Sequence, residues 1–293
     1  MSKVLPSVLG LLVVVAVSAC ADRAKELFSN ARRAMEEDDY PKAARLYQEL
    51  TIQSPDSALA ADAYFELAQI YYLRLRDVDA AKNSLVKVLR DYPDAPINVD
   101  AQRLLARLYE KDLEDPHRAL GLYRELLTDN LDEKTRRQTL RDIGDCQYRM
   151  GEREASANAY RLALGLAYDP DMDSAYMRLA NLEWLGGSAE ESLRLLRELQ
   201  ELTSVEDYQH EAILSEVEIL MSLGRFTEAR ARLLVAEKTF PDSPGVSEVA
   251  TRLNDTEAQH RSLEGKGEEA LLQELQKKIH WGGGRRRRTP PNP

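Results

Sequence analysis

Small and large apolar residues alternate along the chain in a pattern that returns about every 37 residues. In each period, an alanine or serine is followed four residues later by tyrosine or leucine, and three residues further on by an apolar or small residue. The alanine or serine positions are Ala43, Ala81, Ala119, Ser156, Ser192 and Ala229. Spacings of three and four place these residues on one helix face, so each segment is predicted to be a helix.

A second helical pattern precedes each of these segments. Its small or apolar position is occupied by Ala31, Ala68, Ala106, Gly144, Ala180 and Val217. Short breaks such as Met150-Gly151-Glu152 separate the two helices, and Asp115-Pro116 is a typical helix start. Small residues at fixed positions allow paired helices to approach closely. The sequence therefore predicts an all-α array of about six helix-turn-helix repeats over residues 20–244.

This pattern resembles the tetratricopeptide repeat (TPR) family. The resemblance lies in the alanine, the aromatic residue four positions later, the glycine-containing turns, and a proline twelve positions after the alanine, as at Pro55, Pro93 and Pro241. The fourth and fifth repeats depart from it, with serine for alanine and no such proline. The resemblance implies an α-solenoid that forms a right-handed superhelix, with a concave face lined by the first helix of each pair.

Residues 1–19 have a different character. Lys3 precedes an almost wholly apolar run from Val4 to Val17, and 14 residues at ~1.5 Å each cannot span a ~30 Å hydrocarbon core. The run is typical of a signal peptide, and its end at Ser18-Ala19-Cys20 resembles a bacterial lipobox. An ordinary signal peptide with a chance cysteine is the alternative.

The lipobox resemblance implies that Cys20 carries lipid. Ala21, and not aspartate, follows the cysteine. By resemblance to lipoproteins of bacteria with two membranes, this implies an outer-membrane anchor with the body in the periplasm. In a source with one membrane, the outer face of the cell membrane is expected.

Composition narrows the function. The net charge of −10 argues against nucleic acid as the main partner. Two cysteines exclude a disulfide framework, and Cys146 is expected to be a buried small hydrophobe. The sequence contains no catalytic or metal-ligand motif. We therefore expect neither an enzyme nor a cofactor or metal site.

Large side chains recur four residues after the small position of each first helix, and polar side chains lie three residues before them. Rings and polar groups side by side suit a peptide groove, although the same side chains could only pack between repeats. The predicted partner-binding residues are Met35, Tyr72, Arg107, Glu110, Tyr148, Asn181, Trp184 and Met221.

The pattern changes after the repeats. Residues 245–281 are expected to contain a capping helix and a short amphipathic helix. Residues 282–293 form a predicted disordered tail with a basic run, Arg285, Arg286, Arg287 and Arg288. The run either contacts an anionic surface or only keeps the chain soluble.

Together these features predict a non-catalytic, lipid-anchored scaffold that holds protein or peptide partners during outer-membrane biogenesis or envelope assembly. Cys20, the repeat that begins shortly after it, and Tyr92-Pro93-Asp94-Ala95-Pro96 resemble barrel-assembly lipoproteins of the BamD (YfiO) type. The alternative is an accessory lipoprotein of a secretion, pilus or polysaccharide-export machine, or of a peptidoglycan enzyme.

Overall fold

The computed structural model describes residues 22–128 and 131–263. The predicted signal peptide, Cys20, the predicted amphipathic helix over residues 268–280 and the basic tail lie outside these ranges. Across the described ranges the regular structure is helical, without strands. No helix in them is long and apolar enough to cross a membrane. The chain divides into two compact units, Met1–Glu152 (unit 1) and Arg153–Pro293 (unit 2), and each is described by itself.

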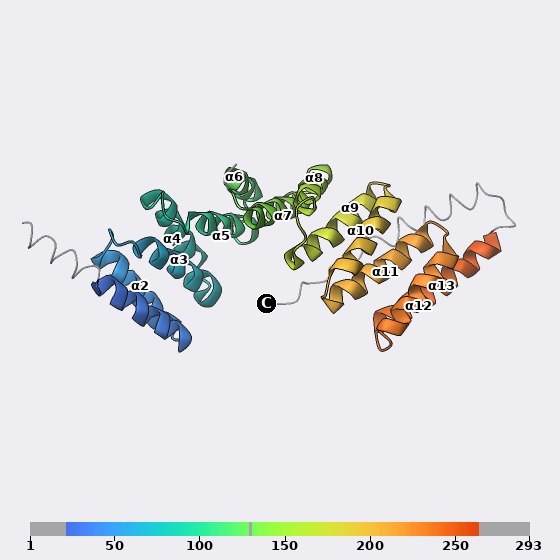
Figure 1. Cartoon of the computed structure of the whole chain (residues 1–293), viewed down its shortest axis with the longest axis horizontal. Coiled ribbons are helices and arrows are strands. Elements are labelled where there is room, and N and C mark those ends of the chain that lie inside the picture. The colour runs from blue at the N-terminus through green and yellow to red at the C-terminus, as the bar shows by residue number, and fades with distance from the viewer. Residues whose placement is uncertain (1–21, 129–130, 264–293) are drawn as a thin grey trace, which may run out of the picture. The chain divides into compact units, whose positions relative to one another are not determined.

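Unit 1 is built of successive helix pairs (Figure 1). Each helix packs against its neighbour in the chain, as α3 does against α4 and α5 against α6. The helices are one over residues 22–36, α2 (Tyr40–Gln53), α3 (Ala60–Gln69) with its π-helical continuation η1 (Ile70–Leu75), α4 (Val78–Asp91), α5 (Asn98–Lys111), α6 (Pro116–Leu126) and α7 (Glu133–Arg149).

Unit 2 is built in the same way, and its helices lie side by side in chain order (Figure 1). They are α8 (Arg153–Leu164), the 3-10 turn η2 (Pro170–Met172), α9 (Asp173–Leu185), α10 (Ala189–Leu202), α11 (Glu206–Ser222), α12 (Phe226–Thr239) and α13 (Pro244–Leu263). The last helix packs on α11 and α12 and buries Val246, Val249 and Leu253. It is the predicted capping helix.

The repeat anchors form the core. The six alanine or serine positions named above are all fully buried, and Tyr47, Tyr123 and Tyr160, four residues after three of them, are fully buried as well. A small residue at the helix contact leaves room for the large ring beside it. Over the described residues, the successive packed helices of each unit and the capping helix confirm the predicted all-α repeat fold.

The turn inside each pair places one residue in the left-handed region. Three of the six are glycine, namely Gly151, Gly187 and Gly224, and three are not. Asp38, Arg76 and Glu114 adopt φ of 56°, 56° and 51°, a conformation that costs a non-glycine residue roughly 1–2 kcal/mol. In these three repeats an aspartate follows at once and caps the next helix, as at Asp39, Asp77 and Asp115.

Repeats two and three contain one extra residue before this turn. The left-handed residue lies 8 positions after the small residue in both (Ala68 to Arg76, Ala106 to Glu114), and 7 positions after it in the first repeat (Ala31 to Asp38). In repeat two the π-helical η1 absorbs the insertion. The amide of Asp77 accordingly donates to Tyr71 O at 2.8 Å, six residues back.

Cys146 lies on α7 in the interior of unit 1. Its side chain is fully buried, and the thiol donates to Pro116 O at 3.3 Å. Burial raises the pKa of the thiol to about 11, so the nucleophilic thiolate is scarce near neutral pH.

Candidate partner-binding groove

A groove of about 300 Å³ opens in unit 2 between the first helices of two successive repeats, α9 and α11, over α10. It contains two of the predicted partner-binding residues, Asn181 and Trp184. The other lining residues are Met177, Arg178, Ala180, Ser192, Leu196, Glu211, Ser215, Glu218 and Ile219.

The floor of the groove is set by the repeat pattern. Ala180 and Ser192 are the small positions of α9 and α10, and both are buried. The Ser192 hydroxyl donates to Ala180 O at 2.6 Å, which ties the two helices together. Trp184 lies one turn after Ala180, half-buried against the core, while Asn181 is exposed. The core therefore holds the Trp184 ring in place, and the Asn181 side chain is exposed to solvent.

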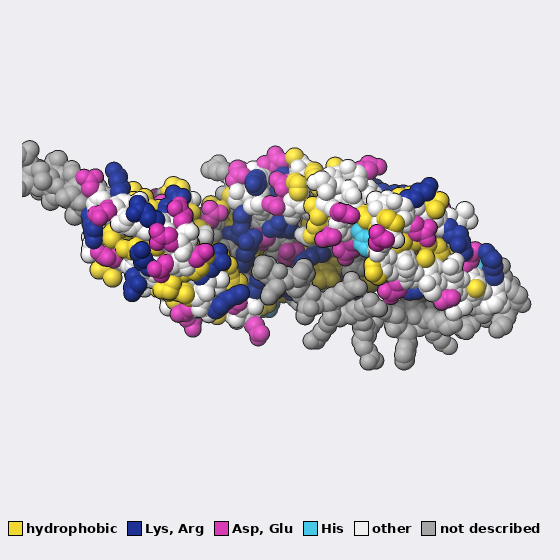
Figure 2. Space-filling model, turned by 90° about the horizontal axis from the view of Figure 1, so that it is seen from below, with side chains coloured by type: hydrophobic (Ala, Val, Ile, Leu, Met, Phe, Trp, Pro, Cys, Tyr) yellow, Lys and Arg dark blue, Asp and Glu magenta, His cyan; other side chains and the backbone are white. Residues whose placement is uncertain are grey.

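Charged residues surround the groove. Glu218 pairs with Arg252 of the capping helix, Glu211 is exposed, and Arg178 donates to the Tyr160 hydroxyl at 3.4 Å. On the face shown in Figure 2, basic and acidic side chains are interspersed over the surface. An aromatic ring, an exposed amide and flanking carboxylates can hold an extended polypeptide by area and by hydrogen bonds to its backbone.

The third predicted residue of unit 2, Met221, is not among the groove's lining residues. It is half-buried on α11 and packs against the core of the unit.

The predicted residues of unit 1 have different surroundings. Met35 is half-buried against the core around Tyr47. Tyr72 is half-buried on η1, and burial, assisted by a hydrogen bond with Asp112, raises its pKa to about 12. Tyr148 is 38% exposed. Arg107 is 40% exposed and donates to Asp142 Oδ2 at 3.4 Å. The surroundings of these four residues do not test whether they contact a partner, so their partner contacts stay predictions.

Glu110 is engaged inside unit 1. Its side chain is only 4% exposed, accepts a hydrogen bond from the Tyr123 hydroxyl at 3.1 Å, and lies 3.2 Å from Arg149 Nε. Burial raises the pKa of the carboxyl, and Arg149 and Tyr123 partly offset this effect. Its geometry is that of an internal ion pair, so our functional proposals do not depend on it.

This raised pKa predicts a pH effect. A folded-state pKa above the usual 4.5 means that the folded protein holds the proton more tightly than the unfolded chain. The contribution of Glu110 to stability is therefore fully present below about pH 4.5 and is lost as the pH rises through the folded-state pKa. We expect the stability of the wild type relative to Glu110→Gln to fall between pH 4.5 and 7. Urea unfolding of both proteins across this range, followed by circular dichroism, measures it; a difference independent of pH would contradict it.

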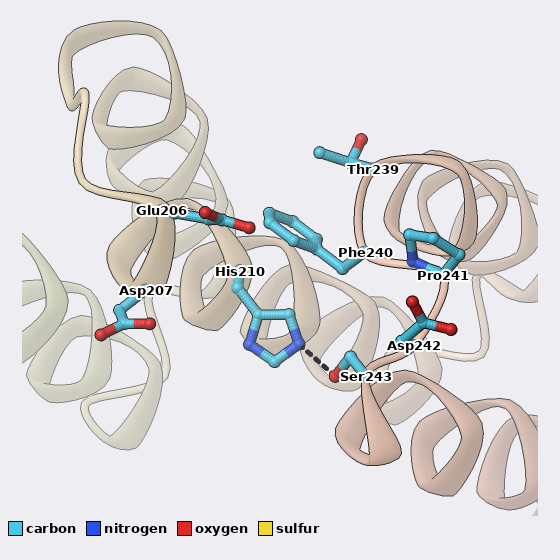
Figure 3. A pocket seen from close by; sticks show the side chains of 8 residues that line it. All are labelled: Glu206, Asp207, His210, Thr239, Phe240, Pro241, Asp242 and Ser243. Carbon is cyan, nitrogen blue, oxygen red and sulfur yellow. Dashed lines mark hydrogen bonds between the residues drawn. The ribbon is translucent and has the colours of Figure 1, made fainter.

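A second hollow, of about 320 Å³, was not predicted from the sequence. It lies between the start of α11 and the turn that joins α12 to α13 (Figure 3). His210 Nε2 and Ser243 Oγ are 2.7 Å apart, and the His210 ring meets Phe240 edge to face. A histidine beside a serine suggests a nucleophile and its base. However, Ser243 Oγ also accepts from the Val246 amide at 3.4 Å, as an N-cap does, so the pair joins α11 to the start of α13.

Among the residues that the structure describes, no group of three or more histidine, cysteine, aspartate or glutamate side chains is placed to hold a metal ion.

In the described part of each unit, successive packed helices with buried small residues define a helical-repeat protein, and unit 2 adds a capping helix and a groove on its first helices. A family model of the tetratricopeptide repeat matches residues 28–81, 70–134 and 141–206, more than half of the chain. The chain therefore belongs to the tetratricopeptide repeat family. Comparison with curated protein sequences gives no match.

Solved structures of similar fold include three whose chains overlap most of this one. PilF of Pseudomonas aeruginosa has a TM-score of 0.58 at 12% identity, over 80% of this chain and 99% of PilF. PilW, a widely conserved type IV pilus biogenesis factor, has a TM-score of 0.56 at 19% identity, over 78% of this chain and 98% of PilW. The apo form of RapI has a TM-score of 0.58 at 16% identity, over 84% of this chain and 76% of RapI. At these identities, the TM-scores show similarity of fold alone.

Proposed function

We propose that this protein is a non-catalytic scaffold of the bacterial envelope that binds a protein or peptide partner in the α9–α11 groove. The groove carries the proposal, because it brings Trp184 and Asn181 together on an open surface between two first helices. Half-buried aromatic side chains with polar neighbours are common anchors in protein interfaces.

The anchoring part of the proposal rests on the sequence around Cys20. Lipid on Cys20 would hold the protein at the outer membrane, facing the periplasm. More than one acyl chain gives stable attachment. Fractionation of cells that express the wild type or Cys20→Ala tests this directly. We expect the wild type in the outer-membrane fraction and the variant in the soluble periplasmic fraction; an unchanged distribution would refute the anchor.

The pathway we favour is assembly of a pilus or a related envelope machine. PilW is described as a pilus biogenesis factor, and PilF and PilW align with most of this chain. This similarity favours the pilus and secretion alternative over barrel assembly of the BamD type, for which the supporting features are the generic ones around Cys20.

Site-specific photo-crosslinking tests the groove. A photoreactive amino acid at position 181 is expected to capture one defined partner in intact cells, and Trp184→Ala is expected to lower the yield about tenfold. Position 162 is the matched control, because Leu162 is 62% exposed on α8, a second helix of the same unit. Its crosslinks should not include that partner.

The identity of the captured protein separates the pathways. A pilus or exporter ring protein would support the favoured pathway, and barrel-assembly subunits would support the other. Equal capture at positions 181 and 162, or capture unaffected by Trp184→Ala in a variant that melts like the wild type, would overturn the groove.

A further inference from the structure

The first helix of unit 1 has a basic hollow beside it that the proposed function does not use. This helix covers residues 22–36 and buries Ala24, Leu27, Ala31 and Ala34 in the core of the unit. A hollow of about 500 Å³ opens next to its exposed residues. The lining side chains that matter for its chemistry are Lys25, Phe28, Arg32, Arg33 and Glu36 of the helix, and Leu59 from the residue before α3.

Positive charge dominates the hollow. Lys25, Arg32 and Arg33 line it with a single carboxylate, Glu36, whereas the whole chain has a net charge of −10. All four side chains belong to exposed residues. Over the part of the chain that the structure describes, no ion pair or side-chain hydrogen bond engages any of the three cations. Their donors are therefore open to a ligand.

The charged residues around the hollow do not neutralise it. Arg23, on the same helix, pairs with Glu26 at 3.0 Å and with Glu49 of α2 at 2.9 Å, so these two carboxylates are already engaged. Burial raises the pKa of Glu66 on α3, and the charge of Arg32 partly offsets this effect. Glu66 is thus near Arg32, but no ion pair joins the two residues in the described ranges.

The hollow also has an apolar wall. Phe28 and Leu59 line it and are both half-buried. The Phe28 ring meets the buried Tyr47 ring edge to face, with the ring centroids 5.3 Å apart, so the core holds it in place. Arginine binds phosphate oxygens through its planar donors, and lysine adds a compact charge. Cations next to an apolar wall suit a phosphate that is attached to carbon groups, as in a phospholipid.

The position of the hollow in the chain favours a bilayer as the source of this phosphate. Cys20 lies two residues before the helix starts, a length of chain that spans at most about 7 Å. Lys25 follows three residues into the helix, about 4.5 Å further, and Arg32 lies two turns after it on the same face. Lipid on Cys20 would therefore keep anionic head groups at high local concentration beside the hollow.

We propose that the hollow lined by Lys25, Arg32 and Arg33 binds the phosphate of an anionic phospholipid head group in the membrane that anchors Cys20. This inference rests on the proposed anchor and adds a second contact with the same bilayer. The helix over residues 22–36 then lies along the membrane surface. An anchor at one residue would leave the protein free to rotate about it, whereas two contacts orient the first repeat.

Cosedimentation with lipid vesicles tests the site without the anchor. The protein is the chain over residues 20–293 with Cys20→Ala, which keeps every residue that the structure describes. The tail arginines are replaced in every sample (Arg285→Gln, Arg286→Gln, Arg287→Gln and Arg288→Gln), so that the basic tail cannot contribute. We expect binding to phosphatidylcholine vesicles that contain phosphatidylglycerol, and little binding to phosphatidylcholine alone. Equal binding to both, or to neither, would overturn the proposal.

Charge reversal locates the contact. Arg32→Glu is expected to weaken binding to the anionic vesicles by about tenfold or more. Arg90→Glu is the matched control, because Arg90 is an exposed arginine of α4 that pairs with its neighbour Asp91 at 2.6 Å. It makes the same change in net charge and should alter the affinity by less than about twofold. Equal weakening by both variants would show non-specific attraction and overturn the site.

Lys25→Glu is the second test variant. Lys25 is exposed and lies two turns from Arg32, so its reversal should weaken binding to a similar extent. It keeps the test valid if Arg32→Glu melts below the wild type. Unchanged binding by Lys25→Glu, in a protein that melts like the wild type, would overturn the site.

Two soluble anions distinguish a bilayer from other sources of negative charge. Glycerol 3-phosphate offers a phosphate without a membrane, and amidated hexaglutamate offers carboxylates. We expect neither to bind measurably at the concentration of phosphatidylglycerol that saturates vesicle binding. Binding of glycerol 3-phosphate that Arg32→Glu abolishes, without vesicle binding, would assign the hollow to a free phosphate. The same result with hexaglutamate would assign it to an acidic polypeptide, and either would overturn the membrane contact.

Failure of this site is distinguishable from failure of the anchor. The vesicle samples carry no lipid on residue 20, whereas fractionation of cells tests the lipid on Cys20. A few cations bind a membrane too weakly to replace a lipid anchor. Vesicle binding that depends on Arg32, together with a failed fractionation test, would leave the head-group site standing and refute the anchor. A successful fractionation test without vesicle binding would refute this site alone.

Discussion

Replacing Glu216 by alanine is expected to lower the free energy of unfolding of unit 2 by about 3 kcal/mol. Glu216 is fully buried on α11. Its carboxylate accepts from Arg197 Nε at 2.6 Å on one oxygen and from Arg232 Nε at 2.7 Å on the other. The side chain thereby joins α10, α11 and α12. Its removal leaves two guanidinium groups without their shared partner and a polar void between three helices.

Tryptophan fluorescence during urea unfolding measures this loss. Trp184, on α9 of unit 2, is the reporter, and the second tryptophan of the sequence, Trp281, lies outside the described residues. Glu237→Ala is the control, because Glu237 is an exposed acidic residue of α12, and a cost within about 0.5 kcal/mol is expected. If Glu216→Ala were as stable as this control, the buried ion pairs would contribute nothing net to the fold.

Two tyrosines at equivalent repeat positions are expected to respond oppositely to loss of the hydroxyl. Tyr123→Phe should lower the free energy of unfolding by about 1–3 kcal/mol, because its hydroxyl donates to the buried Glu110 carboxylate at 3.1 Å. Tyr47→Phe should be neutral or stabilising by up to about 1 kcal/mol, because the buried Tyr47 hydroxyl has no hydrogen-bond partner.

Urea unfolding followed by far-ultraviolet circular dichroism compares the two variants. The rings are alike in burial, since both are fully buried. A difference in sign therefore isolates the hydroxyl. Equal losses would mean that the Tyr47 hydroxyl is satisfied in solution, for example by a buried water.

The repeat fold could be predicted because its cause lies within each repeat. A small residue where two helices touch and a ring one turn later are local features, and Ala119 with Tyr123 shows both. The capping helix was predictable for the same reason, since Val246, Val249 and Leu253 share one face. Such spacing rules depend on helix geometry alone.

Other features depend on partners distant in sequence and could not be predicted. The Glu216 ion pairs join residues 16 and 19 positions apart. The extra residue in repeats two and three could not be assigned to the turn, because the anchor spacing of 38 residues gives the length of the repeat and not the position of the insertion. Only half of the left-handed turn positions are glycine, so glycine identified only half of these turns.

The candidate site was predicted in part. Asn181 and Trp184 are among the residues predicted at two recurring positions of the first helices, and the structure places both of them in the groove. Glu110 occupies the equivalent position of its own repeat, but its side chain contacts Tyr123 and Arg149 inside unit 1. Position along a helix predicts a face, whereas the neighbouring helices decide what that face contacts.

The buried thiol of Cys146 has a practical consequence. Cys20 and Cys146 are the only cysteines in the sequence. With its pKa raised to about 11 and its side chain enclosed, Cys146 should react slowly with maleimides. In a chain that begins after Cys20, two cysteines introduced at exposed positions, one in each unit, would then be the rapidly labelled sites. Pairs of fluorophores or spin labels could thus report the distance between the two units in solution without removal of the native thiol.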